Sequence, residues 1–180
     1  NPFRGFLESE FVGLAHFAKI FEGEEVVQVL INTLQISFMQ IFFAFPMAIV
    51  LSIMLNELRS QVYKRIVQSI IYLPHFLSWV VVVGIFFILL KSDGIINGLL
   101  AELGLGTVNF LTTPALFKPL LVLQVIWKES GWNTIIFLAA LAGVNPQLYE
   151  AAVVDGAGRW RQIWHITLPA IPSTIVILLI

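Results

Sequence analysis

The chain has 180 residues, of which 58% belong to the set AVILMFWYC and 12% are charged, and it contains no Cys. Soluble domains carry about 25% charged residues, so this composition excludes an ordinary soluble globule, a disordered tail and a disulfide-stapled secreted domain. The net charge of −1 provides no basic field that would attract nucleic acid. The composition therefore predicts a membrane protein.

We expect the sequence to be a piece of a longer chain. It begins at Asn1 and Pro2 rather than at an initiator Met. Its last residues, 175–180, stop inside an apolar run shorter than the roughly 20 residues that a helix needs to cross a bilayer core of about 30 Å. No charged segment with an apolar core and a cleavage site opens the chain, so any targeting signal is expected upstream.

Three apolar stretches have the length of a membrane span, namely residues 26–55, 66–90 and 119–143. Pro46 in the first can be tolerated where neighbouring helices satisfy the freed carbonyl. A fourth stretch begins at residues 168–169. We therefore predict an all-α fold, a polytopic transmembrane helix bundle. In it an extracytoplasmic segment, 1–25, precedes an incomplete membrane domain, 26–180.

The short polar segments between these stretches differ in charge. Segment 56–65 carries three basic residues against one acidic residue, and segment 144–167 contains two arginines. An excess of Lys and Arg in short loops marks the cytoplasmic side, so both segments are predicted to be cytoplasmic. Segments 1–25 and 92–118, the latter with a short helix at 95–103, are predicted to lie outside. The alternation of the spans requires the same assignment.

Segment 145–169 has the pattern of a helix–turn–helix. Asn145 is a good N-cap and Pro146 fits the first helical position, while Gly156 can adopt the left-handed conformation that ends a helix. An amphipathic run at i, i+3, i+4 and i+7 spacing follows, made by Trp160, Ile163, Trp164 and Thr167. The segment is predicted to lie between two spans on the cytoplasmic face.

Physical chemistry alone leaves two interpretations of this loop. It is either an amphipathic hairpin that lies among the lipid headgroups, or a docking element that enters a groove on a partner. Small residues favour docking, because a membrane-anchoring face would carry bulkier side chains. These small residues are Ala151, Ala152 and Ala157.

The residues of the loop resemble the EAA loop of ABC importer permeases, whose pattern is E-A-A-x-x-D-G-A followed by I-x-L-P. The matching residues are Glu150, Ala151, Ala152, Asp155, Gly156 and Ala157, and then Ile166, Leu168 and Pro169. One position departs from the pattern, because Ile163 stands where the family has an aromatic residue and Trp164 is its neighbour. The departure affects one packing contact and not the motif.

The resemblance implies a permease fold like that of type I importers and a transport subunit that is not itself an enzyme. In that family the loop forms coupling helices in a cleft of a cytoplasmic ATPase subunit, which places Glu150 at the ATPase contact and Gly156 at the turn. The implied partners are two ATPase subunits that bind the ATP, a second and non-identical permease subunit, an extracytoplasmic solute-binding protein and membrane lipid. The implied location is a prokaryotic plasma membrane, and no cofactor is implied for the chain itself.

Shorter patterns resemble carbohydrate-importer permeases, most of all the subgroup for polysaccharides and oligosaccharides. They include Asn-Thr-Leu at 32–34, Tyr-Leu-Pro-His at 72–75 and Gly-Trp-Asn at 131–133. The function that the resemblance implies is ATP-driven import of a carbohydrate, specifically an oligosaccharide.

Polar residues inside the third span are candidates for a translocation path. Ionisable groups at that depth cost several kcal/mol and usually have a function. The predicted path residues are Glu129, Trp132 and Asn133, followed by Lys128. Alternatively, Lys128 snorkels toward the outer interface or pairs with a residue of another helix. Because adjacent residues lie about 100° apart on a helix, Lys128 and Glu129 are not expected to pair with each other.

Other polar and aromatic residues of the spans are expected to serve packing. His75, alone among apolar neighbours, is expected to be a hydrogen-bonded packing residue, and Trp79 is expected to pack. Gln35 and Gln40 are expected to bond across helices.

Motifs of catalysis and of nucleotide binding do not occur in the printed sequence. It contains no G-x-x-x-x-G-K-[ST] phosphate loop and no H-E-x-x-H or G-x-S-x-G motif. Its three His residues, without any Cys, form no metal-binding pattern. We therefore expect no catalytic, cofactor-binding or metal-binding residues. Three alternatives remain: an ABC permease for another solute, a scaffold without transport activity, and an ion-gradient-driven transporter that uses Lys128, Glu129 and His75.

Overall fold

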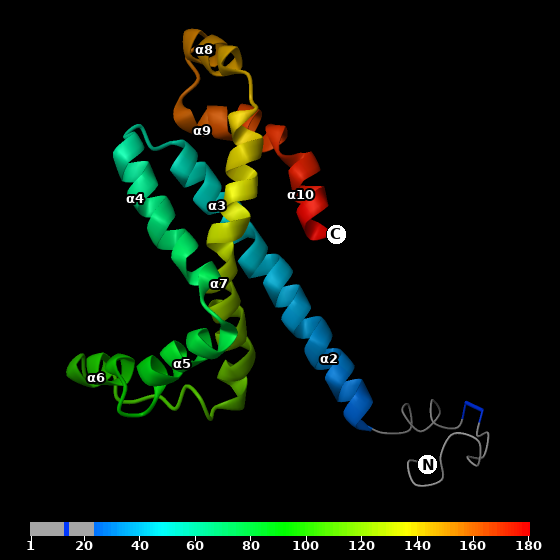
Figure 1. Ribbon diagram of the computed structural model, residues 1–180, viewed down its shortest axis with the longest axis vertical. Coiled ribbons are helices and arrows are strands. Elements are labelled where there is room, and N and C mark those ends of the chain that lie inside the picture. Colours follow the sequence, from blue (N-terminus) through cyan, green and yellow to red (C-terminus); the bar gives the residue numbers. More distant parts are fainter. Residues whose placement is uncertain (1–12, 15–23) are drawn as a thin grey trace. The chain divides into compact units, whose positions relative to one another are not determined.

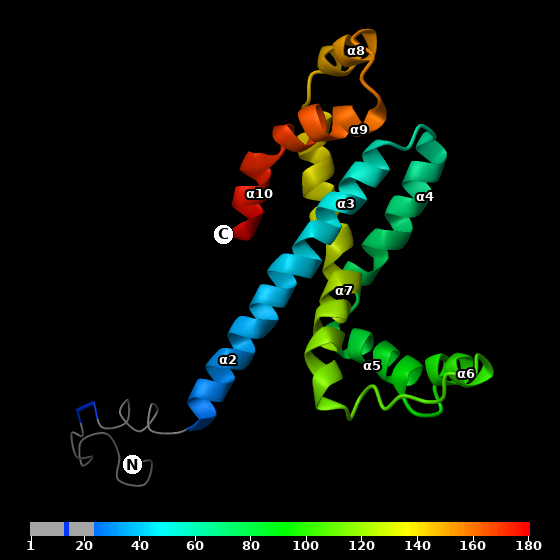
Figure 2. The same cartoon turned by 180° about the vertical axis from the view of Figure 1, so that it is seen from behind.

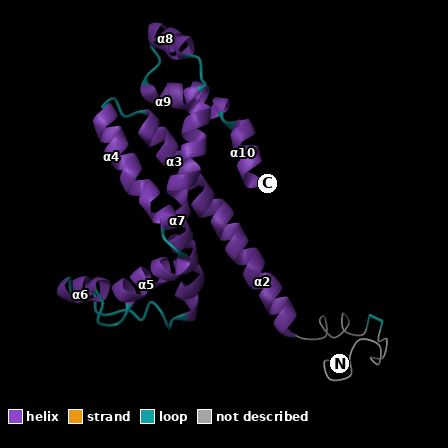
Figure 3. Ribbon diagram, viewed as in Figure 1, coloured by secondary structure: helices purple, strands orange, loops and turns teal. Residues whose placement is uncertain are grey.

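The computed structural model describes residues 13–14 and 24–180, which Figure 1 draws in colour. Every regular element of the described residues is a helix or a helical turn, with no strand among them (Figure 3). The predicted all-α fold is therefore confirmed. The expected extracytoplasmic segment 1–25 lies almost wholly outside the described residues. The chain divides into two units, 1–38 and 39–180, and each is described by itself.

Helix α2 (Glu24–Met39) covers the described helical part of the first unit. Its polar side chains bond along the helix. Gln28 Nε2 donates to Asn32 Oδ1 at 3.1 Å, and Thr33 Oγ1 donates to the carbonyl oxygen of Val29 at 2.8 Å. Such local bonds satisfy polar groups that a hydrocarbon environment would leave unpaired.

A π-helical turn, η1 (Gln40–Ala44), and helix α3 (Phe45–Asn56) belong to the second unit. Pro46 lies in the first turn of α3, where a helix needs no backbone N–H. A widened turn before a proline is one of the local adjustments that let a spanning helix absorb the missing donor. By length and hydropathy, Glu25–Asn56 qualifies as a membrane span, in agreement with the stretch predicted at 26–55.

Several elements of the second unit, including η1 and α3, pack against the long helix α7 (Pro114–Ala142), which contains most of the stretch predicted at 119–143. In both views α3 crosses α7 (Figures 1 and 2). The buried apolar core lies where these two helices meet the C-terminal segment, and it consists of Ala48, Phe137, Leu141 and Ile171. Thr134 is fully buried beside it, with Oγ1 placed 2.6 Å from the carbonyl oxygen of Ser130 and 3.3 Å from that of Ala48.

The prediction of one continuous span at 66–90 is wrong. The chain forms three elements there: helix α4 (Gln61–Tyr72), the 3-10 turn η2 (Leu73–Phe76) and helix α5 (Trp79–Leu90). Pro74 lies in the turn, and Ser78 has extended backbone and caps α5, its Oγ accepting from the N–H of Val81 at 3.4 Å. In both views α4 runs beside α7, whereas α5 turns away. Hydropathy does not reveal this break because the residues on both sides of it are largely apolar.

Helix α6 (Ile95–Glu102) confirms the short helix predicted at 95–103. The side chain of Asn97 is 1% exposed and holds the following loop in place. Its Nδ2 donates to the carbonyl oxygens of Lys91 at 3.1 Å and of Val108 at 3.0 Å, and its Oδ1 accepts from the N–H of Val108 at 2.8 Å. Nearby, Lys91 Nζ donates to Asp93 Oδ2 at 2.9 Å.

We expect Asn97→Leu to loosen the loop at 103–113. The substitution leaves the N–H and carbonyl of Val108 without their partner, and each buried unsatisfied group costs about 1–3 kcal/mol. Limited proteolysis of the full-length protein should therefore cleave this loop faster than in the wild type. Asn109→Leu changes an exposed residue of the same loop and serves as the control. If the loop of Asn97→Leu resisted the protease as well as the wild-type loop does, Asn97 would not be the residue that holds it in place.

The chain continues through five short elements: α8 (Pro146–Val154), α9 (Arg159–Gln162), the π turn η3 (Ile163–Thr167), the 3-10 turn η4 (Leu168–Ala170) and α10 (Pro172–Leu179). By length and composition, two helical stretches of the described residues qualify as membrane spans. Two bent pairs, α7 with α8 and residues 159–170 with α10, can each supply one more.

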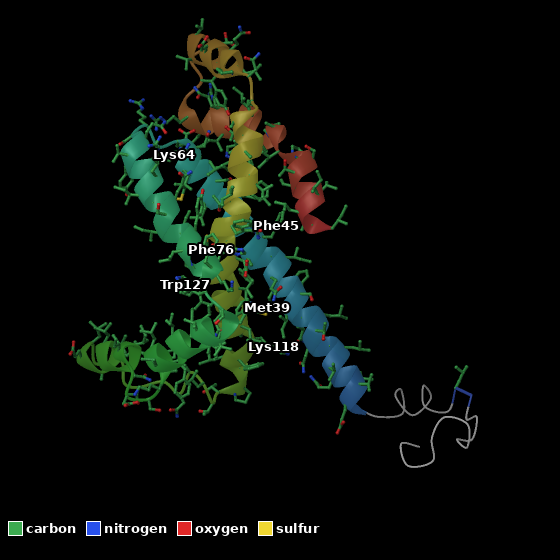
Figure 4. All side chains as sticks on the ribbon, viewed as in Figure 1. Met39, Phe45, Lys64, Phe76, Lys118 and Trp127 are labelled. Carbon is green, nitrogen blue, oxygen red and sulfur yellow. The ribbon has the colours of Figure 1, made fainter. Side chains whose placement is uncertain are left out.

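The second unit has two distinct ends. Helices α8 and α9 lie at the same end of α7 as the turn between α3 and α4, and α6 lies at the opposite end (Figures 1 and 2). Lys64 and Lys118 are labelled at these two ends in Figure 4. The segments predicted to be cytoplasmic, 56–65 and 144–167, therefore share one end.

Candidate functional site

A polar cluster, consisting of His75, Lys128, Glu129 and Trp132, joins α7 to the η2 turn. Glu129 Oε2 lies 2.8 Å from Nδ1 of His75, and Glu129 Oε1 lies 3.3 Å from Nζ of Lys128. The same Nζ donates to the carbonyl oxygen of His75 at 2.7 Å. The prediction that Lys128 and Glu129 do not pair is therefore wrong. Their long side chains converge because the η2 turn brings a partner within reach of both.

Aromatic rings surround this cluster. Trp132 stacks on His75 with ring centroids 4.4 Å apart, and Phe76, labelled in Figure 4, packs edge-on against Trp132. The ring centroid of Trp79 lies 5.4 Å from Nζ of Lys128, within the range of a cation–π contact. Lys128 is only 5% exposed, so it is buried and paired rather than extended toward the interface. His75 is hydrogen-bonded, as the sequence predicts, but it contacts charged and aromatic residues rather than standing alone among apolar neighbours.

Gly131 permits the close approach of α4 to α7 next to the cluster. A Cβ at this position would lie 1.9 Å from the carbonyl oxygen of Ile71 and 2.7 Å from its carbonyl carbon. Real Cβ atoms do not approach backbone atoms so closely, so any side chain would push the two helices apart. Nothing in the sequence near Gly131 indicates this role, because it depends on the position of α4.

A central hollow of about 300 Å³ opens beside the cluster, between η1, α7 and α10. Its polar lining comes from Gln40, Glu129, Ser130 and Asn133. Glu129 and Asn133 are one helical turn apart, so both lie on the same face of α7. Lys128 and Trp132 do not line the hollow. The structure thus brings two of the four predicted path residues together and adds an amide and a hydroxyl that the sequence analysis did not assign to the path.

The central hollow is suited to a hydroxyl-rich solute. The amides of Gln40 and Asn133 each offer donors and an acceptor, the hydroxyl of Ser130 offers both, and the carboxylate of Glu129 accepts. Because Lys128 lies against Glu129, the hollow presents hydrogen-bonding groups rather than an isolated charge. Gln40 also lines this hollow. The only feature of the sequence that could have pointed to this role is that Gln40 is a polar residue within an apolar stretch.

The loop at 145–169 forms a helix–turn–helix, as predicted. Asn145 caps α8, with its Oδ1 accepting from the N–H of Gln147 at 3.0 Å. Gly156 has φ of +75°, the left-handed conformation that ends α8. The second helix is shorter than predicted, because α9 ends at Gln162 and continues as the π turn η3. Trp160, Ile163 and Trp164 nevertheless line one apolar groove together, so most of the predicted amphipathic face is kept across the change in helix type.

The residues of the EAA pattern differ in exposure. Four are exposed and two are half-buried: Glu150, Ala151, Asp155 and Gly156 in the first group, Ala152 and Ala157 in the second. Gln162 Nε2 donates to the carbonyl oxygen of Ala157 at 2.9 Å, and the hydroxyl of Tyr149 lies 3.1 Å from that of the fully buried Thr167. These bonds, which the sequence analysis missed, hold α8 on α9 and η3 and leave the outer face of α8 open to a partner.

The described residues combine helical stretches that qualify as membrane spans, a polar hollow among the helices and an exposed helix–turn–helix at one end. The chain belongs to the family of binding-protein-dependent transport system inner membrane components, whose profile matches residues 28–180. The resemblance to ABC importer permeases is thus confirmed.

Similar proteins come from carbohydrate transport systems. Over its whole length the chain is 53% identical to the polygalacturonan/rhamnogalacturonan transport system permease protein YteP of Bacillus subtilis (strain 168), and it covers 56% of that protein. It is 44% identical, with a TM-score of 0.91, to a chain of a bacterial ABC transporter involved in the import of the acidic polysaccharide alginate, over 96% of this chain and 61% of that one. A bacterial alginate ABC transporter in complex with an alginate pentasaccharide-bound periplasmic protein gives 45% identity and a TM-score of 0.90, over 93% and 59% of the two chains. The chain thus spans little more than half the length of its relatives.

Proposed function

We propose that this chain is the core of a transmembrane permease subunit in an ATP-driven ABC importer of carbohydrate, with an oligosaccharide as substrate. The observation that carries the proposal is the exposed helix–turn–helix of α8 and α9, in which Glu150 is open to solvent and Gly156 makes the turn. The names of similar transporters, which concern polysaccharides, support the substrate class. ATP is bound and hydrolysed by separate subunits, so this chain needs neither a cofactor nor catalytic residues.

The proposed location is a prokaryotic plasma membrane with a defined orientation. Segments 56–65 and 144–167 face the cytoplasm, and segments 1–25 and 92–118 face outward. The excess of Lys and Arg in the first pair supports this orientation, as does the position of that pair at the end of α7 opposite to α6.

The proposed partners follow from this orientation. Two ATPase subunits bind the cytoplasmic loops at 145–169 of this subunit and of a second, non-identical permease subunit. An extracytoplasmic binding protein delivers the substrate to the outer segments, a role supported by the periplasmic protein in a similar transporter. ATP shifts the membrane helices between inward-open and outward-open states only as far as the closed ATPase dimer binds one arrangement of the loops better than the other.

The proposed translocation path includes the central hollow. Glu129 and Asn133 contact the sugar, and the exposed ring of Trp132 offers a flat face for stacking on it. Lys128 acts as a positioning residue, because its buried Nζ holds the carboxylate of Glu129 and the carbonyl oxygen of His75.

Asn133→Ala should lower oligosaccharide uptake by about tenfold. The substitution removes the amide from the central hollow, and two hydrogen bonds of about 0.5–1.5 kcal/mol each account for a loss of this size. Uptake of labelled oligosaccharide into cells that produce the full-length transporter measures it. Gln124→Ala, on the same helix but outside the hollow, is the matched control and should transport like the wild type. Wild-type uptake by Asn133→Ala would remove this residue from the path.

Crosslinking from the loop tests the proposal itself. Ala151→Cys in the full-length protein places a thiol on the exposed face of α8, in a stretch of chain that contains no other Cys. We expect it to capture an ATPase subunit in membranes, with a yield that changes between the nucleotide-free and the ATP-bound states. Ala101→Cys, exposed on α6 at the opposite end, should capture none. A full-length protein that transports but captures no ATPase would contradict the proposal and favour transport driven by an ion gradient.

A further inference from the structure

Two hollows of opposite character meet at the end of α3. The first, here called the apolar groove, has a volume of about 560 Å³ and lies between α3 and the segment 160–168. The second, here called the polar pocket, has a volume of about 540 Å³ and lies between the turn at 56–61 and the segment 153–162. Glu57 lines both. The two hollows therefore adjoin at Glu57, one of them apolar and the other polar.

The apolar groove exposes large side chains. Met54 on α3 is 61% exposed, and Trp160 and Trp164 on the opposite wall are 76% and 64% exposed. Among the described residues that line the groove, Glu57 is the only charged one, and it lies where the groove meets the polar pocket. An apolar surface of this kind needs an apolar occupant.

The polar pocket carries an excess of positive charge. Arg59 and Arg159 line it, against the single carboxylate of Glu57. Arg159 Nη1 lies 3.6 Å from Oε2 of Glu57, and both side chains keep part of their surface exposed. One guanidinium therefore balances the carboxylate, and the other is available to an anion. A guanidinium pairs well with phosphate oxygens, because its donors match their geometry.

We propose that the apolar groove and the polar pocket bind one anionic glycerophospholipid, with an acyl chain between α3 and Trp164 and the phosphate at Arg59 and Arg159. The groove extends along α3 toward the basic end of the unit, which is the order of acyl chain and headgroup in the cytoplasmic leaflet. Trp160 and Trp164 belong to the segment 144–167 that we place at the cytoplasmic face, and tryptophans gather at membrane–water interfaces. A packed helix is a poorer occupant, because the apolar wall gives way to charged residues where a helix would continue.

Lipid retention tests this site in the complete transporter. The full-length complex is purified in detergent, stripped of lipid and titrated with phosphatidylglycerol, and the bound lipid is counted by native mass spectrometry. We expect one tightly bound lipid. Ile53→Trp fills the groove and should weaken that binding by about tenfold, and Arg59→Gln, which removes the guanidinium that is not paired with Glu57, should weaken it by a similar factor. Val80→Trp, at an 83% exposed position of α5 outside the groove, is the control and should bind like the wild type.

The chemical class of the ligand is tested separately. Diacylglycerol carries the same acyl chains without the phosphate, so Arg59→Gln should not change its affinity, whereas Ile53→Trp should weaken it. If neither variant changes the retention of phosphatidylglycerol, the bound lipid is part of the general annulus and the proposal is wrong.

Crosslinking in intact membranes uses none of the variants above, so its result does not depend on whether those variants fold. Met54→Cys, modified with a benzophenone maleimide and irradiated in cells, places the probe at the mouth of the groove. An adduct with the mass of a phospholipid supports the proposal. An adduct with another segment of this chain, or with a second permease subunit, shows that protein covers the groove and overturns the proposal.

Discussion

Gly131→Ala should greatly reduce the amount of folded full-length protein. The added Cβ would lie 1.9 Å from the carbonyl oxygen of Ile71, and a backbone atom cannot move aside as the end of a side chain can. Helix α4 must therefore separate from α7, which also pulls the η2 turn and its His75 away from Glu129. Overpacking of this kind costs about 3 kcal/mol or more when the backbone has to shift.

The test heats the purified full-length protein in detergent and measures the fraction that remains folded at each temperature by fluorescence-detected size-exclusion chromatography. Gly84→Ala is the matched control, because Gly84 also lies inside an apolar helix and has no atom within 4 Å of an added Cβ. This control should unfold at or slightly above the wild-type temperature, since alanine favours a helix over glycine. Equal stability of the two variants would show that α4 and α7 are not held at this distance.

Gly156→Val should abolish transport and leave membrane insertion intact. Gly156 has φ of +75°, and valine in that conformation costs about 1–3 kcal/mol of local strain. The turn between α8 and α9 must then change, so the loop no longer presents α8 in the orientation in which we propose that it binds the ATPase. We expect ATP hydrolysis by the full transporter to continue while uptake of substrate falls at least about tenfold.

Gly104→Val separates the effect of strain from the effect of position. Gly104 has nearly the same φ, +73°, and likewise has no atom within 4 Å of an added Cβ, but it lies in the loop after α6 at the opposite end. It should keep transport coupled to ATP hydrolysis. If Gly156→Val transports like the wild type at normal protein levels, the turn has no part in coupling.

Glu150→Lys tests the same loop without any backbone strain. The exposed charge is reversed, and exposed substitutions change stability by only about 0.5 kcal/mol. Uptake should nevertheless fall while ATP hydrolysis continues, because the charge at the proposed ATPase contact is reversed. Glu102→Lys, equally exposed on α6, is the control for charge. A loss of uptake in both variants would indicate a general electrostatic effect rather than a contact at the loop.

Local patterns predicted the parts of the fold that depend on neighbours in the chain. The N-cap at Asn145, the left-handed turn at Gly156 and the short helix α6 all follow from residues within one or two helical turns of each other. The break in the second span was missed. A proline turn and a capping serine were both visible, but a spanning helix tolerates such residues when its neighbours satisfy the backbone.

The sequence by itself determined the composition of the spans, the distribution of charge between their ends, and the motif of the loop at 145–169. Each of these is a property of residue type and spacing along one segment. Only the tertiary structure decided that Lys128 and Glu129 meet at His75, that Gly131 must lack a side chain, and that Gln40 lines the same hollow as Asn133. Those relations join residues on different helices, and the distances between them depend on how the helices pack rather than on spacing in the chain.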